Sequence, residues 1–397
     1  MYKAPHQFEP LLPSEARMEP LLAKAHDLSR LATTLAGARV PPELRSLLRS
    51  MNSYYSNRIE GQHTRPHEID QALRRDFSQD PSLATKQRLA VAHIEAEEVL
   101  ERRYGGAAGA QALYTVSAVQ DVHRELFARL PVADLLTPDG EPIVPGELRS
   151  RDVKVGLHVA PAHASVPGFL ERWASFYGNV RRGEATLVAM AAAHQCMGWI
   201  HPFIDGNGRV MRLHTHILLS ALGYTGGLWS PLRGFARSTE RYYALLADAD
   251  VPRRGDLDGR GALSEQALIA WIDYVLDICM DQCSFMAGMV GFEGMKERIE
   301  ACLVFEAKVL KSGVRQEALR GLHYLFLSGE EMARGDFKAM LAMKERNATD
   351  VLGALIKRGL LKSDSPQGKV RFGLPQHALR FLFPHLWPEA EADAATL

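Results

Sequence analysis

Residues 201–212 read HPFIDGNGRVMR, and this stretch says more about the chain than any other. Gly206 and Gly208 flank Asn207 directly before a predicted helix. Glycines there let the backbone approach a bound molecule closely and point N–H groups at it. The stretch therefore predicts an anion site at the start of a helix.

Two arginines and a carboxylate extend this predicted anion site. Arg209 and Arg212 are three residues apart and share a helix face, where two guanidinium groups can hold a polyphosphate that the helix dipole also favours. Asp205 lies at the rim, where its carboxylate can hold Mg²⁺ between itself and phosphate oxygens. The residues thus predict a magnesium-assisted polyphosphate site.

A histidine precedes the site by four residues. His201 has a reference pKa of about 6.5, so it can be neutral at cellular pH, as a general base must be to take a proton from a hydroxyl. Pro202 biases His201 away from helical dihedrals, so we expect its ring in a connection, free to face a cleft. A lone histidine or Gly-Asn-Gly turn is usually structural, but their combination favours a catalytic site.

Length and composition limit the possibilities. With 397 residues, 46% hydrophobic and 24% charged, the chain is expected to fold into two or three domains. Lys plus Arg equals Asp plus Glu at 47 each, so no overall charge attracts nucleic acid or anionic membranes. Without a signal-peptide pattern or a long apolar run, we expect a cytoplasmic protein with no membrane span. The four cysteines form no CxxC pair and are expected to be reduced.

Helical periodicity dominates the chain. Between the helices, apolar and polar residues alternate over 152–159, which predicts a strand or hairpin. The helices are predicted at 17–36, 41–59, 67–76, 84–103, 111–129, 166–181, 184–199, 212–222, 240–249 and 264–290.

The pattern changes after about residue 300. Short helices, a turn at 363–368 and a strand at 369–372 are typical of a winged helix. Such a domain can bind DNA through a modest basic group or dock a protein, and both alternatives stay open. The basic group comprises Lys357, Arg358, Lys369 and Arg371.

The stretch HPFIDGNGRVMR resembles the signature of the Fic family, HxFx(D/E)GNGRxxR, at every fixed position. Residues 50–290 also resemble the helical core of that family. The resemblance implies a mainly α fold, with a Fic-type helical bundle core, a small β-hairpin flap and a C-terminal winged helix-turn-helix domain. The expected parts are an N-terminal helical region at 1–110, a catalytic core at 111–290, a winged helix at 291–385 and a frayed tail at 386–397.

The resemblance implies a protein adenylyltransferase that uses ATP. His201 would deprotonate a Ser, Thr or Tyr hydroxyl of a target, and that oxygen would attack the α-phosphate with pyrophosphate leaving. Tyr243 resembles a position that contacts adenine, although a core role is the alternative. The remaining implied ligands are Asp205 for Mg²⁺ and Gly206, Asn207, Gly208, Arg209 and Arg212 for the phosphates.

The hairpin at 148–160 resembles the family's flap, against which a target protein pairs as an extra strand. A purely structural hairpin is the alternative. A homodimer is plausible by resemblance.

Residues 56–61 read SNRIEG and form a second motif. Ser56 and Glu60 share a helix face, and Gly61 can end the helix. Alone, this is an ordinary solvated face, but one class of Fic proteins carries (S/T)xxxE(G/N) there. In that class the glutamate pairs with the second arginine of the signature, here Arg212, so it occupies the place of the γ-phosphate and misaligns ATP.

Two other functions remain open. The same site could remove AMP from a modified target, with Glu60 orienting a water. Alternatively, the protein could be a transcriptional regulator whose winged helix binds DNA and whose Fic core senses a nucleotide. The pairs His214 with His216 and His158 with His163 come without a third acidic or thiolate ligand, so core or surface roles are expected for them.

Overall fold

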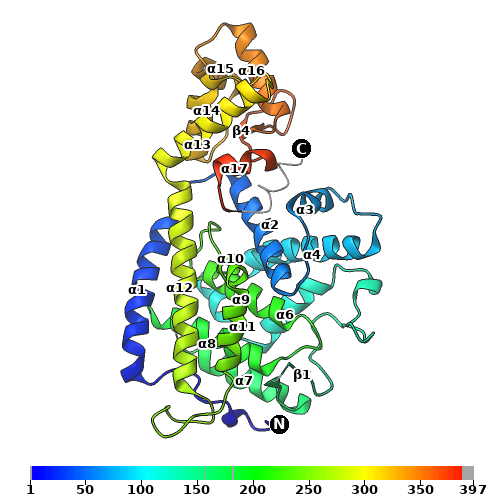
Figure 1. The fold of residues 1–397 in the computed structure, drawn as a ribbon, viewed down its shortest axis with the longest axis vertical. Helices are drawn as coiled ribbons and strands as arrows, with labels where there is room; N and C mark the ends of the chain where they lie inside the picture. The colour runs from blue at the N-terminus through cyan, green and yellow to red at the C-terminus, as the bar shows by residue number, and fades with distance from the viewer. Residues whose placement is uncertain (1, 157, 181–182, 387–397) are drawn as a thin grey trace. The chain divides into compact units, whose positions relative to one another are not determined.

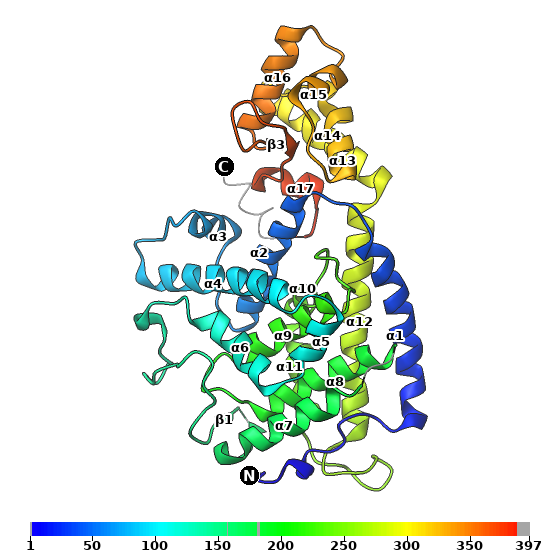
Figure 2. The ribbon, with the colours of Figure 1, turned by 180° about the vertical axis from the view of Figure 1, so that it is seen from behind.

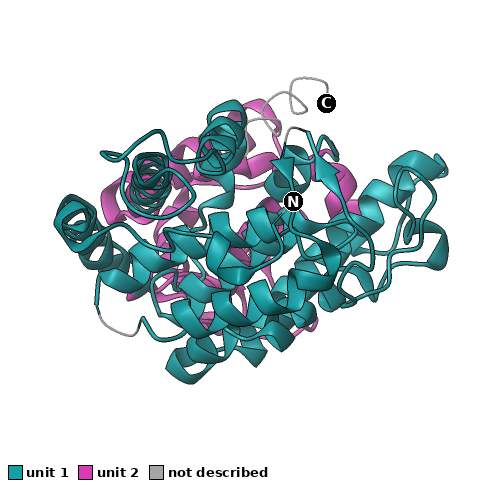
Figure 3. Ribbon diagram, turned by 90° about the horizontal axis from the view of Figure 1, so that it is seen from below, with its two compact units in different colours: residues 1–36, 52–64, 72–283 teal, residues 37–51, 65–71, 284–397 magenta. Residues whose placement is uncertain are grey.

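The computed structural model describes residues 2–156, 158–180 and 183–386. The chain forms two compact units, each assembled from separate segments (Figure 3). The first contains residues 1–36, 52–64 and 72–283, and the second contains 37–51, 65–71 and 284–397. Apart from Leu386, the predicted frayed tail lies outside the described residues.

The first unit is helical, with a small hairpin. Its helices surround two buried helices, α8 and α9, which pack against each other, and α1 runs beside α12 (Figures 1 and 2). The helices up to α12 are α1 (Glu15–Ala36), α2 (Pro42–Ile59), α3 (Pro66–Leu73), α4 (Pro81–Arg103), α5 (Gly106–Leu113), α6 (Val116–Phe127), α7 (Val166–Tyr177), α8 (Ala185–Ile200), α9 (Asn207–Ala221), α10 (Leu232–Arg237), α11 (Thr239–Asp248) and α12 (Glu265–Val290), of which α2, α3 and α12 extend into the second unit.

The central helix α8 is buried on nearly all sides. Its sequence, ATLVAMAAAHQCMGWI, combines alanines of high helix propensity with apolar side chains all round, which is typical of a core helix. Trp199 and Ile200, at its end, are almost completely buried. This packing fixes the position from which the chain enters residues 201–212.

The prediction of one continuous helix at 111–129 is wrong, because two separate helices, α5 and α6, occupy this region. α5 ends at Leu113, and α6 begins after Thr115, whose backbone is extended (φ −133°, ψ 152°). The Thr115 hydroxyl accepts a hydrogen bond from the Ala118 N–H at 3.1 Å, an N-cap that periodicity alone does not reveal.

The hairpin predicted at 152–159 is present. Strands β1 (Lys154–Val155) and β2 (His158–Val159) pair antiparallel, with Lys154 opposite Val159. Gly156 lies in the turn with φ of 58°. Val155 and Val159 are 46% and 41% exposed, so the hairpin presents apolar side chains to solvent.

The second unit contains several short helices and a second hairpin. Strands β3 and β4 pair antiparallel, and a bridge from Met332 to Val370 adds a third extended segment. These elements follow the expected order, and their assignment as a winged helix stays a prediction. They are α13 (Phe292–Val304), a π-helical turn (Phe305–Val309), α14 (Leu319–Ser328), α15 (Arg334–Met340), α16 (Glu345–Lys357), β3 (Leu361–Lys362), β4 (Arg371–Phe372) and α17 (Leu379–Leu382).

Part of the predicted basic group is already paired with carboxylates. Arg358 donates two hydrogen bonds to Glu306, at 2.8 and 2.9 Å. Arg371 forms ion pairs with three carboxylates, Glu43, Glu331 and Asp364. These pairs reduce the positive charge available for a DNA backbone.

Across the described residues, no single helix is long and apolar enough to cross a membrane.

Candidate active site

The connection after α8 begins at His201, which adopts a left-handed backbone (φ 50°, ψ 62°). Its N–H donates to the Met197 carbonyl at 3.1 Å and closes the helix. Burial, with added repulsion from His158 and Arg149, lowers the pKa of His201 to about 4. The imidazole is therefore neutral near pH 7, the form that accepts a proton.

The loop after His201 is closed by Asn207. Its side-chain oxygen accepts from the Phe203 N–H at 2.9 Å, and its amide nitrogen donates to the Phe203 carbonyl at 2.8 Å. Both functional groups of Asn207 thus hold the loop. The sequence predicted a phosphate contact for Asn207, but in this structure its side chain shapes the backbone.

The periodicity predicted the following helix only from residue 212, although the motif already placed Arg209 at its start, and the periodicity is wrong here. α9 begins at Asn207 instead of residue 212, so Asn207 and Gly208 form its first turn and Gly206 precedes it. Gly206 has φ of 77°, and a Cβ there would lie 2.5 Å from the ring of Phe127. Because the first N–H groups of a helix have no intrahelical partners, α9 points donors into the site.

Arg209 and Arg212 are buried, and each retains an unpaired nitrogen. Among the described residues, Arg209 Nε and Arg212 Nη1 have no hydrogen-bond partner. The Arg209 guanidinium lies 5.0 Å from the Phe127 ring centroid, and its Nη2 lies 3.5 Å from Oδ2 of Asp205. Buried donors without partners are costly, so these nitrogens indicate a place for a ligand anion.

Glu60 reaches Arg212 from α2. The Glu60 carboxylate accepts from Arg212 Nη2 at 2.6 Å, while Arg212 also donates to the Ser56 hydroxyl at 3.1 Å and the Ser56 carbonyl at 3.0 Å. Burial would raise the pKa of Glu60, but attraction to Arg212 and its hydrogen bond outweigh burial and lower the pKa. Glu60 is therefore held as a carboxylate.

Gly208 allows this pairing. A Cβ at Gly208 would lie 2.3 Å from Oε1 of Glu60 and 2.9 Å from Nη1 of Arg212. The predicted inhibitory residue thus sits directly over the first turn of α9. The structure brings the two sequence motifs together in one site.

The end of α2 is fixed by its own backbone. Gly61 has φ of 73°, its N–H donates to the Arg58 carbonyl, and the Gln62 N–H donates to the Asn57 carbonyl. This pattern is a Schellman motif.

Tyr243, predicted to contact adenine, donates from its hydroxyl to the Ile59 carbonyl at 3.1 Å. Tyr243 therefore contacts the end of the helix that carries Glu60.

His123 supports the loop from α6, and sequence reasoning missed it. Nδ1 of His123 accepts from the Gly146 N–H at 2.8 Å, so Nε2 carries the proton and faces the Asp205 carbonyl at 3.3 Å. Its ring stacks on Phe203 at 4.0 Å. Burial lowers the pKa of His123 to about 3, which keeps the ring neutral. In the sequence, only the position of His123 on the apolar face of a predicted helix could have indicated that it supports this loop.

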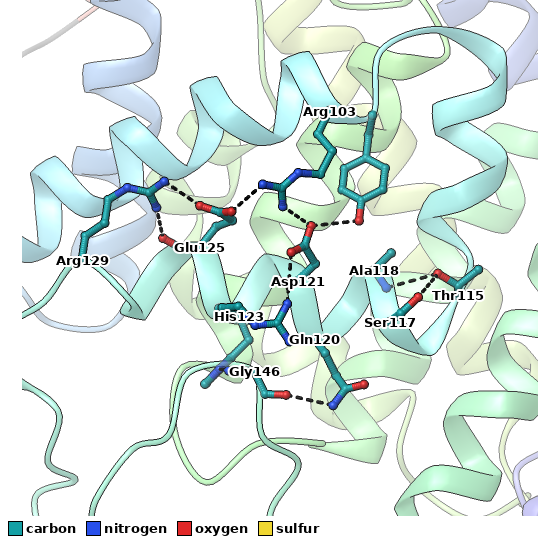
Figure 4. A network of polar contacts seen from close by, with 12 residues as sticks. Arg103, Thr115, Ser117, Ala118, Gln120, Asp121, His123, Glu125, Arg129 and Gly146 are labelled. Carbon is teal, nitrogen blue, oxygen red and sulfur yellow. Dashed lines mark hydrogen bonds and ion pairs between the residues drawn. The ribbon is translucent and has the colours of Figure 1, made fainter.

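Charged pairs anchor α6 to α4 (Figure 4). Arg103 of α4 contacts Asp121 and Glu125 of α6, and Arg129, just beyond α6, contacts Glu125 and also Glu95 of α4. The same view shows Gln120 donating to the Gly146 carbonyl at 2.9 Å. These contacts position the helix on which His123 and the loop at Gly146 depend.

Arg149 is a second residue that sequence reasoning missed. Its guanidinium donates to the carbonyls of His201, Arg151 and Pro161 at 2.8, 2.8 and 2.5 Å. The backbone N–H of Arg149 donates to the Pro202 carbonyl. Arg149 thereby ties the base of the hairpin to the loop that carries His201.

The comparisons with known proteins agree with this geometry. Residues 113–219 match the Fic/DOC family. The chain carries a Fic domain. Proteins named protein adenylyltransferase Fic from Drosophila mojavensis and Drosophila ananassae are both 32% identical, over 127 and 111 residues. These matches cover 32% and 28% of this chain and 23% and 20% of those proteins, so the chain spans less than a quarter of their length.

A solved structure shares the fold of this Fic-domain chain. The crystal structure of a Fic family protein from Desulfovibrio desulfuricans G20 matches 93% of this chain and 99% of its own, with a TM-score of 0.55 and 17% identity. The mainly α fold with a Fic-type core is thus confirmed.

Proposed function

We propose that this Fic-domain protein transfers AMP from ATP to a Ser, Thr or Tyr hydroxyl of a protein, itself included, and that Glu60 restrains the transfer. The observation that carries the proposal is the Glu60–Arg212 pair, 2.6 Å long, in a site that also contains a neutral His201. Homologues named protein adenylyltransferase support the reaction class.

In this reaction His201 takes the proton of the target hydroxyl. The hydroxyl oxygen forms a bond to the α-phosphorus of ATP, and the bond from that phosphorus to the pyrophosphate oxygen breaks. The products are a protein–AMP phosphodiester and pyrophosphate. The neutral imidazole of His201 suits this role because it has a vacant site for the proton.

The phosphates would lie over the first turn of α9. The first N–H groups of α9 have no intrahelical partner, and the side-chain donors Arg209 Nε and Arg212 Nη1 have no partner among the described residues. Asp205, whose side chain is 37% exposed at the rim, offers a carboxylate of the kind that binds Mg²⁺ beside phosphates. Mg²⁺, when bound, would neutralise phosphate charge and orient the leaving group.

Restraint would follow from competition for Arg212. The carboxylate of Glu60 uses the Nη2 edge that an outer phosphate oxygen needs, and it brings a negative charge against the phosphates. ATP could then bind only in a displaced pose with its α-phosphate poorly aligned for attack. Removal of the carboxylate should release the arginine.

The decisive experiment compares wild type with Glu60→Gly. Loss of a charge-assisted hydrogen bond worth about 1.5–3 kcal/mol corresponds to a rise in auto-modification of roughly ten- to a hundred-fold. Incorporation of radiolabelled AMP from ATP measures it. Glu60→Gln should also activate, because the amide lacks the charge.

The double variant His201→Ala, Glu60→Gly is the control and should incorporate no label. Mass spectrometry of a lysate incubated with ATP and Glu60→Gly would name the target and the modified residue. If Glu60→Gly incorporates no more AMP than wild type, Glu60 does not restrain this enzyme.

The target is proposed to dock along the hairpin β1–β2. Val155 and Val159 are exposed there, and a two-stranded hairpin can accept a further strand. Arg149 links the hairpin to the carbonyl of His201, so a docked strand would lie near His201, the proposed general base.

Removal of AMP is the second candidate, favoured by the position of Glu60. Glu60 and His201 are close enough to influence each other's pKa, so a carboxylate and an imidazole share the site. Such a pair could orient a water toward the phosphodiester of a modified target. Release of AMP by wild type, lost in Glu60→Gly, would identify this direction.

A further inference from the structure

A second cluster of titratable side chains lies in the helical core, on a different part of α9. Glu97 and Glu101 are one turn apart on α4, and His216 lies on α9, one turn beyond Arg212. One ligand atom from each of the three lies within 4.8 Å of the others. None of these residues has a role in the proposed transfer of AMP.

The distances within the cluster match the edges of a metal coordination sphere. Nε2 of His216 lies 3.3 Å from Oε1 of Glu97 and 3.5 Å from Oε1 of Glu101. A tetrahedral site with metal–ligand distances of about 2.0–2.1 Å has edges of about 3.3–3.4 Å. Two of the three edges therefore match the spacing of ligands on one ion, and the third, between the two carboxylates, is within 4.8 Å.

Burial makes this cluster unusual. The side chains of His216 and Glu97 are 2% and 1% exposed, while that of Glu101 is 14% exposed. Two carboxylates are expensive to remove from water unless a positive charge balances them. A divalent cation would balance both carboxylates, and Glu101 marks the side from which the ion could enter.

His93 supplies an independent observation. It lies one turn before Glu97 on α4, is 1% exposed, and neither of its ring nitrogens has a hydrogen-bond partner among the described residues. Its Nδ1 lies 3.9 Å from Oε2 of Glu97, and that oxygen also lacks a hydrogen-bond partner among the described residues. A buried imidazole and a buried carboxylate oxygen that both lack partners call for an explanation, and an ion bound beside them supplies one.

Asn52 orients the central carboxylate. Its amide nitrogen donates to Oε1 of Glu97 at 2.9 Å. Partners of this kind fix the direction of metal-ligating carboxylates. Asn52 lies on α2, on the same face as Ser56 and Glu60, so the cluster also contacts the helix that carries the proposed restraint.

We propose that Glu97, Glu101 and His216 bind one divalent transition-metal ion; His93, whose Nδ1 lies 3.9 Å from Oε2 of Glu97, would have to move closer to become a fourth ligand. Imidazole with carboxylate ligands suits zinc, manganese and ferrous iron, and Zn²⁺ is the appropriate first probe. The ion would be structural, tying α4 to α9 beneath α2. The alternative is a buried ion-pair triad in which a protonated His216 serves both glutamates without metal.

Zinc uptake by the 397-residue chain distinguishes the metal site from the ion-pair triad. The protein is stripped with a chelator, equilibrated with Zn²⁺ under excess Mg²⁺ to occupy oxygen-only sites, desalted and analysed by plasma mass spectrometry. We expect one tightly held Zn²⁺ per chain, and a loss of affinity of more than about ten-fold in Glu101→Gln.

Glu98→Gln is the matched control, because Glu98 lies on the same helix with its side chain 47% exposed and outside the cluster. It should retain the wild-type stoichiometry. Circular dichroism verifies that each variant is folded, and visible absorption of bound Co²⁺ reports tetrahedral coordination in wild type directly. Equal Zn²⁺ binding by wild type and folded Glu101→Gln, or no binding by wild type, would establish the ion-pair triad instead.

Discussion

Arg212 connects two motifs that are about 150 residues apart in the sequence. It is 0% exposed and holds Ser56 and Glu60 through three hydrogen bonds. The sequence predicted this pair through the family resemblance, because each partner occupies a fixed position of its motif. His123 and Arg149 were not predictable in the same way, since they act through backbone carbonyls and amides that no spacing rule specifies.

Tyr243 gives a test at the scale of one residue. Tyr243→Phe removes the hydrogen bond to the Ile59 carbonyl, worth about 0.5–1.5 kcal/mol, and should loosen the end of α2. We expect auto-modification to rise roughly two- to ten-fold with the KM for ATP unchanged, because the ring remains. Tyr243→Ala should instead raise the KM if the ring contacts adenine. An unaltered rate in Tyr243→Phe would show that the hydroxyl does not hold α2 in place.

Helix positions were predicted well where periodicity alone sets them. α2, expected at 41–59, spans Pro42–Ile59, and α12, expected at 264–290, spans Glu265–Val290. Errors arose where local hydrogen bonds decide, as at the Thr115 cap and at the start of α9, where Asn207 bonds Phe203. Caps and closed loops depend on backbone geometry that hydrophobic spacing does not encode.

The Schellman end of α2 gives a test at the scale of an element. Gly61→Ala puts a Cβ on a residue with φ of 73°, which costs about 1–2 kcal/mol although no atom lies within 4 Å of it. Unwinding relieves that strain and moves Glu60 away from Arg212, so auto-modification should rise on the order of a few-fold. Gly61→Asn is the control, because asparagine tolerates this conformation and should change the rate less.

The division of the whole molecule into units was the hardest feature to predict. Sequence reasoning proposes contiguous blocks, yet the second unit combines 284–397 with 37–51 and 65–71. Within that unit Arg371 pairs with Glu43, a contact across 328 positions. Only the three-dimensional arrangement reveals such pairs. The buried cluster of His216 with Glu97 and Glu101 could not be predicted for the same reason, since its members come from two helices that are far apart in the sequence.

Buried neutral histidines should make the stability of the first unit pH-dependent. Burial lowers the pKa of His123 and of His194 to about 3, whereas both titrate near about 6.5 when unfolded. Between these values the unfolded chain binds more protons, so the free energy of unfolding falls as the pH falls below about 6.5. Each histidine contributes up to about 1.4 kcal/mol per pH unit.

Melting curves between pH 7.5 and about 5 measure this effect. The variant His194→Gln should show a flatter dependence, whereas His63→Gln, at an exposed position, should keep the wild-type slope. A melting temperature that is constant over this range would contradict the proposed linkage.

The Nη1 of Arg212, which has no hydrogen-bond partner among the described residues, would make the proposed restraint by Glu60 selective instead of absolute. Glu60 and Ser56 occupy Nε and Nη2, which leaves one N–H edge buried and ready for an anion. A diphosphate nucleotide could therefore enter while the carboxylate stays in place, whereas a triphosphate must share the occupied edge. In calorimetric titrations, Glu60→Gly should tighten binding of ATP much more than binding of ADP, so that resting enzyme would act as a reservoir for the shorter nucleotide.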